Sequence, residues 1–288
     1  MNALMLIVAG LTIGQTEPGP KNAERAEGVN AWRVALDLIA KEHRIAPADR
    51  SDEPFRLIEK PVFVWSQPIR SGQIGSVYPW VAKNGRPGAL AAVFCWNRTT
   101  EYWAIMHEFH SLADTPLKVT YRDAVIWTPA EPGLRWKALP IEAPVATSQA
   151  RQLSQIRHIS RRFQAYTVTP EMEQWQLRLL PRPLYEYTVD DGGSVLAGAV
   201  VALCQDMDPE LVLVIEARQV TSGVAWHYAC GTFTDYESHL SFGGQEIWKG
   251  AASQGEANLT PEKIYWREFI TRRASPPQSE GQPATWTE

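Results

Sequence analysis

Residues Leu196–Val220, LAGAVVALCQDMDPELVLVIEARQV, contain the pattern that decides the fold of this chain. Two apolar runs, each long enough for a strand, flank the polar turn Gln205–Pro209. Short apolar runs between turn residues are typical of buried strands. Because a parallel crossover needs a dozen or more residues, this short turn predicts that the two strands are antiparallel.

The segments on either side extend the same pattern. Strands are predicted over Leu177–Val189, Ala225–Phe233 and His239–Trp248, with Gly243-Gly244 as a tight hairpin or bulge inside the last segment. All connections are short, so the sheet is predicted to be an antiparallel meander. The first half of the chain follows a similar plan, with a turn at Asn84–Gly88.

Comparison of the chain with itself indicates an internal duplication. Apolar, aromatic and proline positions match at a distance of 121 to 123 residues, as in Arg56–Trp65 with Arg178–Tyr187, Leu90–Phe94 with Leu211–Ile215, Trp103 with Trp226, and Ile126-Trp127 with Ile247-Trp248. Chance matches would scatter in their spacing. The distance exceeds the 20 to 50 residues of solenoid repeats, so each copy is predicted to be a domain with its own core.

A helix is predicted at the start of each copy. Over Asn22–His43, the residues Val29, Trp32, Leu36 and Ile39 form an apolar stripe at helical spacing. In the second copy Thr147 or Ser148 is the expected N-cap, and Leu153, Ile156, Ile159 and Phe163 form the stripe. The predicted fold class is therefore α+β, with two tandem copies of an N-terminal helix packed on an antiparallel β-meander sheet.

The first residues are interpreted as a secretory signal. Leu4–Ile13 is an uncharged apolar run that is too short to span a bilayer, and small residues precede a cleavage point ahead of Gln15. No Lys or Arg precedes this run, so a buried first strand is the competing interpretation. The expected organisation is a signal peptide at 1–14, a linker at 15–20, repeats at 21–140 and 147–271 joined by a linker at 141–146, and a disordered tail at 272–288. We expect an exported protein, periplasmic or extracellular.

The leader ending near Gly-Gln, the two copies, and the segments Asp208–Arg218 and Trp226–Ala229 together resemble uncharacterised exported proteins of planctomycete bacteria. The resemblance spans most of the chain, although its motifs have low specificity. It implies export. It supplies no activity and no functional residue.

Composition narrows the possible functions. The chain has 28 basic and 32 acidic side chains, for a net charge of -4. Binding to nucleic acid without sequence preference needs clustered Lys and Arg, so a nucleic-acid partner is not expected. The three cysteines, Cys95, Cys204 and Cys230, lack zinc-type spacing and are predicted to be free buried thiols.

His107, Glu108 and His110 form the densest cluster of possible metal ligands. The surrounding sequence predicts a strand, on which residues three apart face opposite ways. A metal site at His107 and His110 is therefore the less favoured alternative. A second acid–base set, Asp235 and Glu237 near His239, is of a kind that chance readily produces.

The chain contains 12 tryptophans. Three pairs recur at matched positions and are predicted to pack in the core, because packing positions are retained after duplication. Trp65, Trp80, Trp96 and Trp175 have no tryptophan counterpart and are the predicted ligand contacts.

No nucleotide-binding loop, GxSxG elbow or reactive-cysteine motif is present in the sequence. The favoured hypothesis is a non-enzymatic binding or structural module for a protein or an apolar ligand, without a cofactor. The alternative is a hydrolase or metal-dependent enzyme with a single site in the first repeat, around His107, Glu108 and His110.

Overall fold

The computed structural model describes residues 20–67, 72–97, 102–141, 143–189, 192–253 and 260–275. The predicted signal peptide and most of the predicted tail lie outside these ranges. The fold is mostly β, with 53% strand, 11% helix and three antiparallel sheets that include a half-barrel. The predicted α+β class, two copies of a helix on a meander sheet, was therefore wrong.

The helices are α1 (Pro20–Lys41) and α2 (Gln149–Ser160). The strands of the first half are β1 (His43–Pro47), β2 (Arg56–Leu57), β3 (Phe63–Gln67), β4 (Gln73–Val81), β5 (Pro87–Asn97), β6 (Trp103–Ser111), β7 (Leu117–Tyr121), β8 (Ala124–Trp127) and β9 (Lys137–Ala138). Those of the second half are β10 (Phe163–Val168), β11 (Gln174–Leu179), β12 (Tyr185–Thr188), β13 (Val195–Gln205), β14 (Asp208–Val220), β15 (Gly223–Thr232), β16 (Glu237–Phe242), β17 (Gln245–Gly250) and β18 (Tyr265–Ala274).

The strands do not form one meander per half. A small sheet has the order β1-β7-β8, a second has the order β18-β6-β5-β4-β2 with β3 also on β4, and the largest runs β17-β16-β10-β11-β13-β14-β15-β9 with β12 also on β13. The predicted antiparallel pairing around Gln205–Pro209 is confirmed, since β13, β14 and β15 are consecutive antiparallel neighbours. The predicted hairpin at Gly243-Gly244 joins β16 to β17, and both glycines have positive φ, 59° and 86°.

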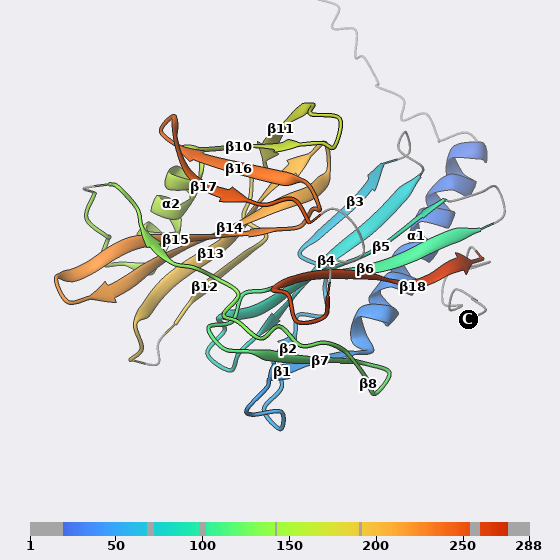
Figure 1. Ribbon diagram of the computed structural model, residues 1–288, viewed down its shortest axis with the longest axis horizontal. Helices are drawn as coiled ribbons and strands as arrows, with labels where there is room; N and C mark the ends of the chain where they lie inside the picture. Colours follow the sequence, from blue (N-terminus) through green and yellow to red (C-terminus); the bar gives the residue numbers. More distant parts are fainter. Residues whose placement is uncertain are drawn as a thin grey trace, which may run out of the picture.

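Two strands pair with a strand of the opposite half of the chain, which the sequence did not predict. β9, the last strand of the first half, pairs with β15, and β18, at the end of the second half, pairs with β6. Figure 1 shows α1 and α2 toward opposite ends of the long axis, with the sheets between them. The predicted repeat boundaries and the tandem duplication stay predictions.

Three apolar cores hold these layers together. The first, the α1 core, lies between α1 and one face of β4–β6, and it contains Leu36 and Trp80. The third, the α2 core, lies between α2 and the nine-stranded sheet and contains Ile156, Val201 and Leu240. The second, which we call the shared core, lies between the two large sheets and contains side chains from both. The alternation of β13 makes this possible, because Val200 belongs to the shared core and Val201 to the α2 core.

The local predictions differ from the structure mainly at the ends of elements. α1 ends at Lys41 and α2 at Ser160, so His43 and Phe163 begin strands instead of closing helices. The first residues of the tail predicted from residue 272 belong to β18 instead, since Ala274 is buried and pairs with Trp103. Neither helix in the described ranges is long and apolar enough to cross a membrane.

Candidate functional site

The structure separates the two histidines of the predicted metal alternative. His107 lies in the α1 core, whereas His110 lies against Gly231 of β15 on the other side of β6. This is the arrangement that strand periodicity predicts for residues three apart. Within the described residues, no group of three His, Cys, Asp or Glu side chains is placed to hold a metal ion.

His107 instead pairs with His43 of β1. The two side chains are 6% and 2% exposed, for His43 and His107 respectively, and His43 Nε2 lies 2.9 Å from His107 Nδ1. His43 Nδ1 donates to the Ile39 carbonyl at 2.9 Å, so its Nε2 accepts a hydrogen bond from His107. Burial lowers the pKa of His43 to about 4 and lowers that of His107 well below its ordinary value, so the pair is neutral near pH 7.

His110 is also kept neutral, since burial lowers its pKa to about 4. Its ring packs so closely on Gly231 that a Cβ there would lie 2.2 Å from Nε2. Phe233 stands 6.3 Å from the imidazole, centre to centre. The ring therefore fills the contact between β6 and β15.

Glu108 points into the contact between the halves, where Tyr265 of β18 donates a hydrogen bond to it. Burial raises the pKa of Glu108 to about 8, with smaller raising effects from Asp208 and Glu210 and an opposing effect from Arg267. A carboxyl group with a strongly raised pKa is a recognised property of catalytic acids, but ion-pair networks produce such shifts as well. His110 shares the Glu108 face of β6 and is the ladder partner of Tyr265, whereas His107 lies on the opposite face, in the α1 core. The predicted trio of His107, Glu108 and His110 is therefore divided between the two faces of β6.

Glu216 of β14 is a second buried carboxylate. Arg86 donates to it through Nε at 2.8 Å and through a terminal nitrogen at 3.3 Å, and Tyr187 donates at 2.7 Å. Arg86 also pairs with Asp114 and lies over Trp136, whose ring centre is 5.6 Å from the guanidinium carbon. Since Arg86 belongs to the first half and Glu216 to the second, this network ties the halves together.

The four tryptophans predicted as ligand contacts occupy separate places. Trp65 and Trp80 are each 1% exposed, in the shared core and the α1 core respectively. Trp96 is half-buried between Phe94 and Phe269, and Trp175 is half-buried with its ring edge-on to Tyr236. The structure does not bring the four together, and their role as ligand contacts stays a prediction.

The acid–base set around His239 forms in part. His239 Nε2 lies 2.9 Å from Glu237 and Nδ1 lies 2.7 Å from Glu246, while Tyr166 stacks on the ring at 4.4 Å. Lys249 in turn pairs with Glu237 at 2.8 Å. Both ring nitrogens are therefore engaged by carboxylates on the surface of the β10, β16 and β17 strands.

The three cysteines lie buried and without disulfides. Cys204 and Cys230 occupy β13 and β15, which are separated by β14. Burial raises the pKa of the Cys95 and Cys230 thiols, which makes the reactive thiolate scarce at neutral pH.

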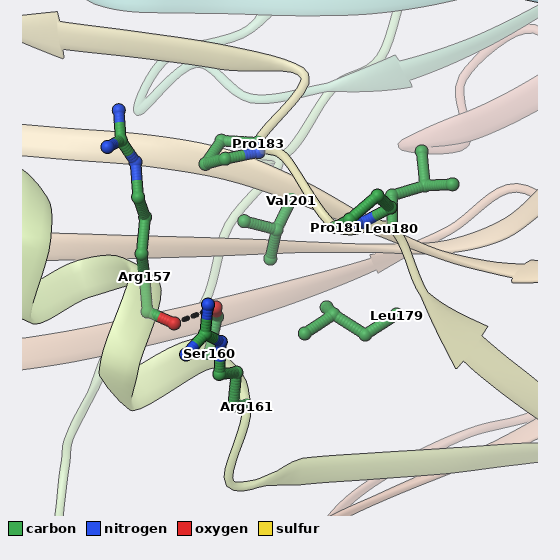
Figure 2. A pocket seen from close by; sticks show the side chains of 8 residues that line it. All are labelled: Arg157, Ser160, Arg161, Leu179, Leu180, Pro181, Pro183 and Val201. Atoms are coloured by element: carbon green, nitrogen blue, oxygen red, sulfur yellow. Dashed lines mark hydrogen bonds between the residues drawn. The ribbon is translucent and has the colours of Figure 1, made fainter. Parts of the chain in front are cut away.

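A hollow of about 250 Å³ lies between the C-terminal turn of α2 and the break between β11 and β12. Figure 2 shows Arg157 and Ser160 of α2 on one side, Pro181 and Pro183 on the other, and Val201 between them. The remaining lining residues are Arg161, Leu179 and Leu180. The floor is apolar and the helix side carries positive charge.

Local structure explains why the hollow forms here. Pro181 and Pro183 cannot donate ladder hydrogen bonds, so the predicted strand Leu177–Val189 divides into β11 and β12. α2 ends at Ser160, whose hydroxyl donates to the Arg157 carbonyl at 3.0 Å. The helix end and the proline break face each other over Val201.

A more open hollow of about 590 Å³ adjoins the first and shares Arg157, Pro181 and Pro183 with it. Arg182 and Glu186 also line this second hollow. Arg157 donates two hydrogen bonds to the Glu186 carboxylate, both at 2.7 Å. The guanidinium group therefore stands at the border between the two hollows.

Searches of protein-family models, curated proteins and solved structures found no significant match to this chain.

Sequence reasoning did not find the hollow. Its lining comes from 157–161, 179–183 and 201, which carry no recognised motif and meet only in the folded chain. The two prolines were the available signal, because they argue against one continuous strand over Leu177–Val189.

Proposed function

We propose that this protein is a non-enzymatic binding module that takes an apolar ligand in the hollow between α2 and the Pro181–Pro183 break. The observation that carries the proposal is the hollow's apolar floor, formed by Leu179, Leu180 and Val201. Small-molecule sites are typically concave, largely apolar and furnished with a few polar groups at the rim. Arg157 and Ser160 supply such groups here.

The size of the hollow indicates a short ligand segment. A water molecule takes up about 30 Å³ in the liquid, so 250 Å³ has room for about eight groups of that size. An alkyl chain of about that many carbons is therefore a suitable probe. The neighbouring hollow leaves space for a larger ligand to continue past Pro183.

The test uses 1-octanol as a neutral apolar probe, with binding followed by calorimetry on the purified protein. Leu179→Glu places a charge on the apolar floor and is expected to abolish octanol binding. Val125→Glu is the matched control, since Val125 is an exposed apolar residue, 54% accessible, outside the hollow. Octanol that fails to bind the wild type, or that binds Leu179→Glu equally well, would overturn the proposal.

Export, the signal peptide, the planctomycete resemblance and the internal duplication belong to this proposal as well. The support for export is the apolar run Leu4–Ile13 followed by small and turn-forming residues. We expect the protein isolated from its native host to begin near Gln15, as measured by intact mass. A mature chain that retains Met1 would contradict export by this route.

A further inference from the structure

We propose that the ligand is an amphiphile with a single carboxylate head, held by Arg157 while its alkyl chain lies on Leu179 and Val201. This inference rests on the proposed function, because it assigns the chemical class of the ligand in the same hollow. The assignment comes from the position of Arg157 between the two hollows and from the group that its guanidinium already binds.

The geometry of the Arg157–Glu186 pair identifies the head group. Both hydrogen bonds measure 2.7 Å, one from Nε and one from a terminal nitrogen, so the guanidinium fork engages both carboxylate oxygens. A guanidinium presents parallel donors that match a planar carboxylate. Glu186, which lines the second hollow, thus occupies the place beside Arg157 that a ligand carboxylate would take.

Charge around the hollows favours an anion. Arg157, Arg161 and Arg182 line them, and Glu186 is the one acidic side chain in either lining. With Glu186 paired to Arg157, the other two guanidinium groups still make the rim positive. A carboxylate ligand would therefore enter a region of complementary charge.

Displacement of Glu186 is feasible because its ion pair is accessible. The Arg157 and Glu186 side chains are 53% and 25% exposed. Exposed ion pairs contribute little to stability, since water screens the charges and both side chains lose freedom. A released Glu186 side chain can return to solvent, whereas a bound ligand also gains contact with the apolar floor.

The experiment compares octanoate with 1-octanol, which share chain length and differ in the head group. Octanoate is expected to bind wild-type protein about ten-fold more tightly, as a charge-assisted bidentate contact allows. Arg157→Gln is expected to bring the ratio of the two affinities close to one. The control is Arg151→Gln, an exposed arginine of the same helix outside both linings, which is expected to keep the ten-fold ratio.

A second variant tests the competition directly. Glu186→Gln removes the resident carboxylate and is expected to tighten octanoate binding by about three-fold, as is typical for loss of a surface ion pair. Equal affinities of octanoate and octanol, both abolished by Leu179→Glu, would overturn this inference and leave the proposed function standing. Tighter binding of octyl phosphate than of octanoate would also overturn the carboxylate assignment. Failure of octanol to bind wild-type protein would overturn the proposed function itself.

Discussion

Glu216 and Glu108 are both buried carboxyl groups, but they differ in their partners. Glu216 receives hydrogen bonds from Arg86 and Tyr187. Glu108 receives one from Tyr265 and has the carboxylates of Asp208 and Glu210 nearby. A paired carboxylate keeps its charge at low cost, whereas a desolvated one near other carboxylates retains its proton.

Loss of Glu216 should be strongly destabilising. Glu216→Leu keeps the side chain's bulk but leaves Arg86 and Tyr187 without their main partner. Breaking a buried ion pair from one side costs about 3 to 5 kcal/mol of unfolding free energy, measured by urea denaturation. Glu131→Gln, in a pair whose side chains are 86% and 70% exposed, is the control and should change stability little. Similar losses in the two variants would contradict a central role for the Glu216 network.

Glu108 should make stability fall as pH rises. Its folded pKa, about 8, lies above the ordinary value of 4.5, so between these limits the folded protein holds a proton that the unfolded chain has released. The stabilisation is fully present below pH 4.5 and is lost as pH rises through 8. The slope contributed by this group is no more than about 1.4 kcal/mol per pH unit.

The measurement compares urea denaturation of wild type and Glu108→Gln at several pH values between 5 and 8. The neutral amide removes the titration, so the unfolding free energy of wild type should decrease relative to that of the variant across this interval. Parallel curves would show that Glu108 is ionised in the folded protein, against the burial argument.

The contact between β6 and β15 depends on the absence of a side chain at one position. A Cβ on Gly231 would lie 2.2 Å from His110 Nε2, and the ring is buried with little room to move. Gly231→Ala is therefore expected to cost about 1 to 3 kcal/mol of unfolding free energy by overpacking. Gly28→Ala is the control, because no atom lies within 4 Å of the added Cβ there.

A double substitution separates this clash from a backbone effect. His110→Ala frees the space that the new methyl group needs, so Gly231→Ala should cost less in that background. In double-mutant cycles, the coupling free energy between residues in contact is about 0.5 to 3 kcal/mol. Additive losses in the double variant would place the cost in the β15 backbone instead.

The sequence predicted elements better than it predicted their assembly. The β13–β14–β15 meander and the Gly243-Gly244 hairpin follow from apolar runs and turn residues, and both are confirmed. Phe163 shows how a strand is missed, because it lies four residues after Ile159 and so continues the helical stripe, yet it begins β10. The site was missed for another reason, since helix end, proline break and Val201 are brought together only by tertiary packing.

The exchange of edge strands explains why the predicted fold class was wrong. β9 has only two residues and so gives little sequence signal, whereas β18 has ten. Nothing in either sequence indicates that its partner strand lies in the opposite half of the chain. Their partners, β15 and β6, lie in the opposite half. The pairing of β18 with β6 buries Trp266 in the α1 core. The core of the first half therefore includes a side chain from the last described strand.

The shared core leads to the last prediction, which concerns cooperativity. Side chains from both halves meet there, including Val77 and Leu90 from the first and Val200 and Val212 from the second. Unfolding either half would expose apolar surface of the other and also remove one of its edge strands. We therefore expect a single transition in urea, with tryptophan fluorescence and far-UV circular dichroism giving the same midpoint.

Two core variants test this expectation. Leu36 belongs to the α1 core and Ile156 to the α2 core, and both are fully buried. Each substitution to alanine should lower the unfolding free energy by about 2 to 5 kcal/mol. If the halves unfold together, either variant shifts the one midpoint seen by both probes. If each half were a domain with an independent core, Leu36→Ala would move one of two transitions and Ile156→Ala the other, and the shared core would then contribute too little to couple them.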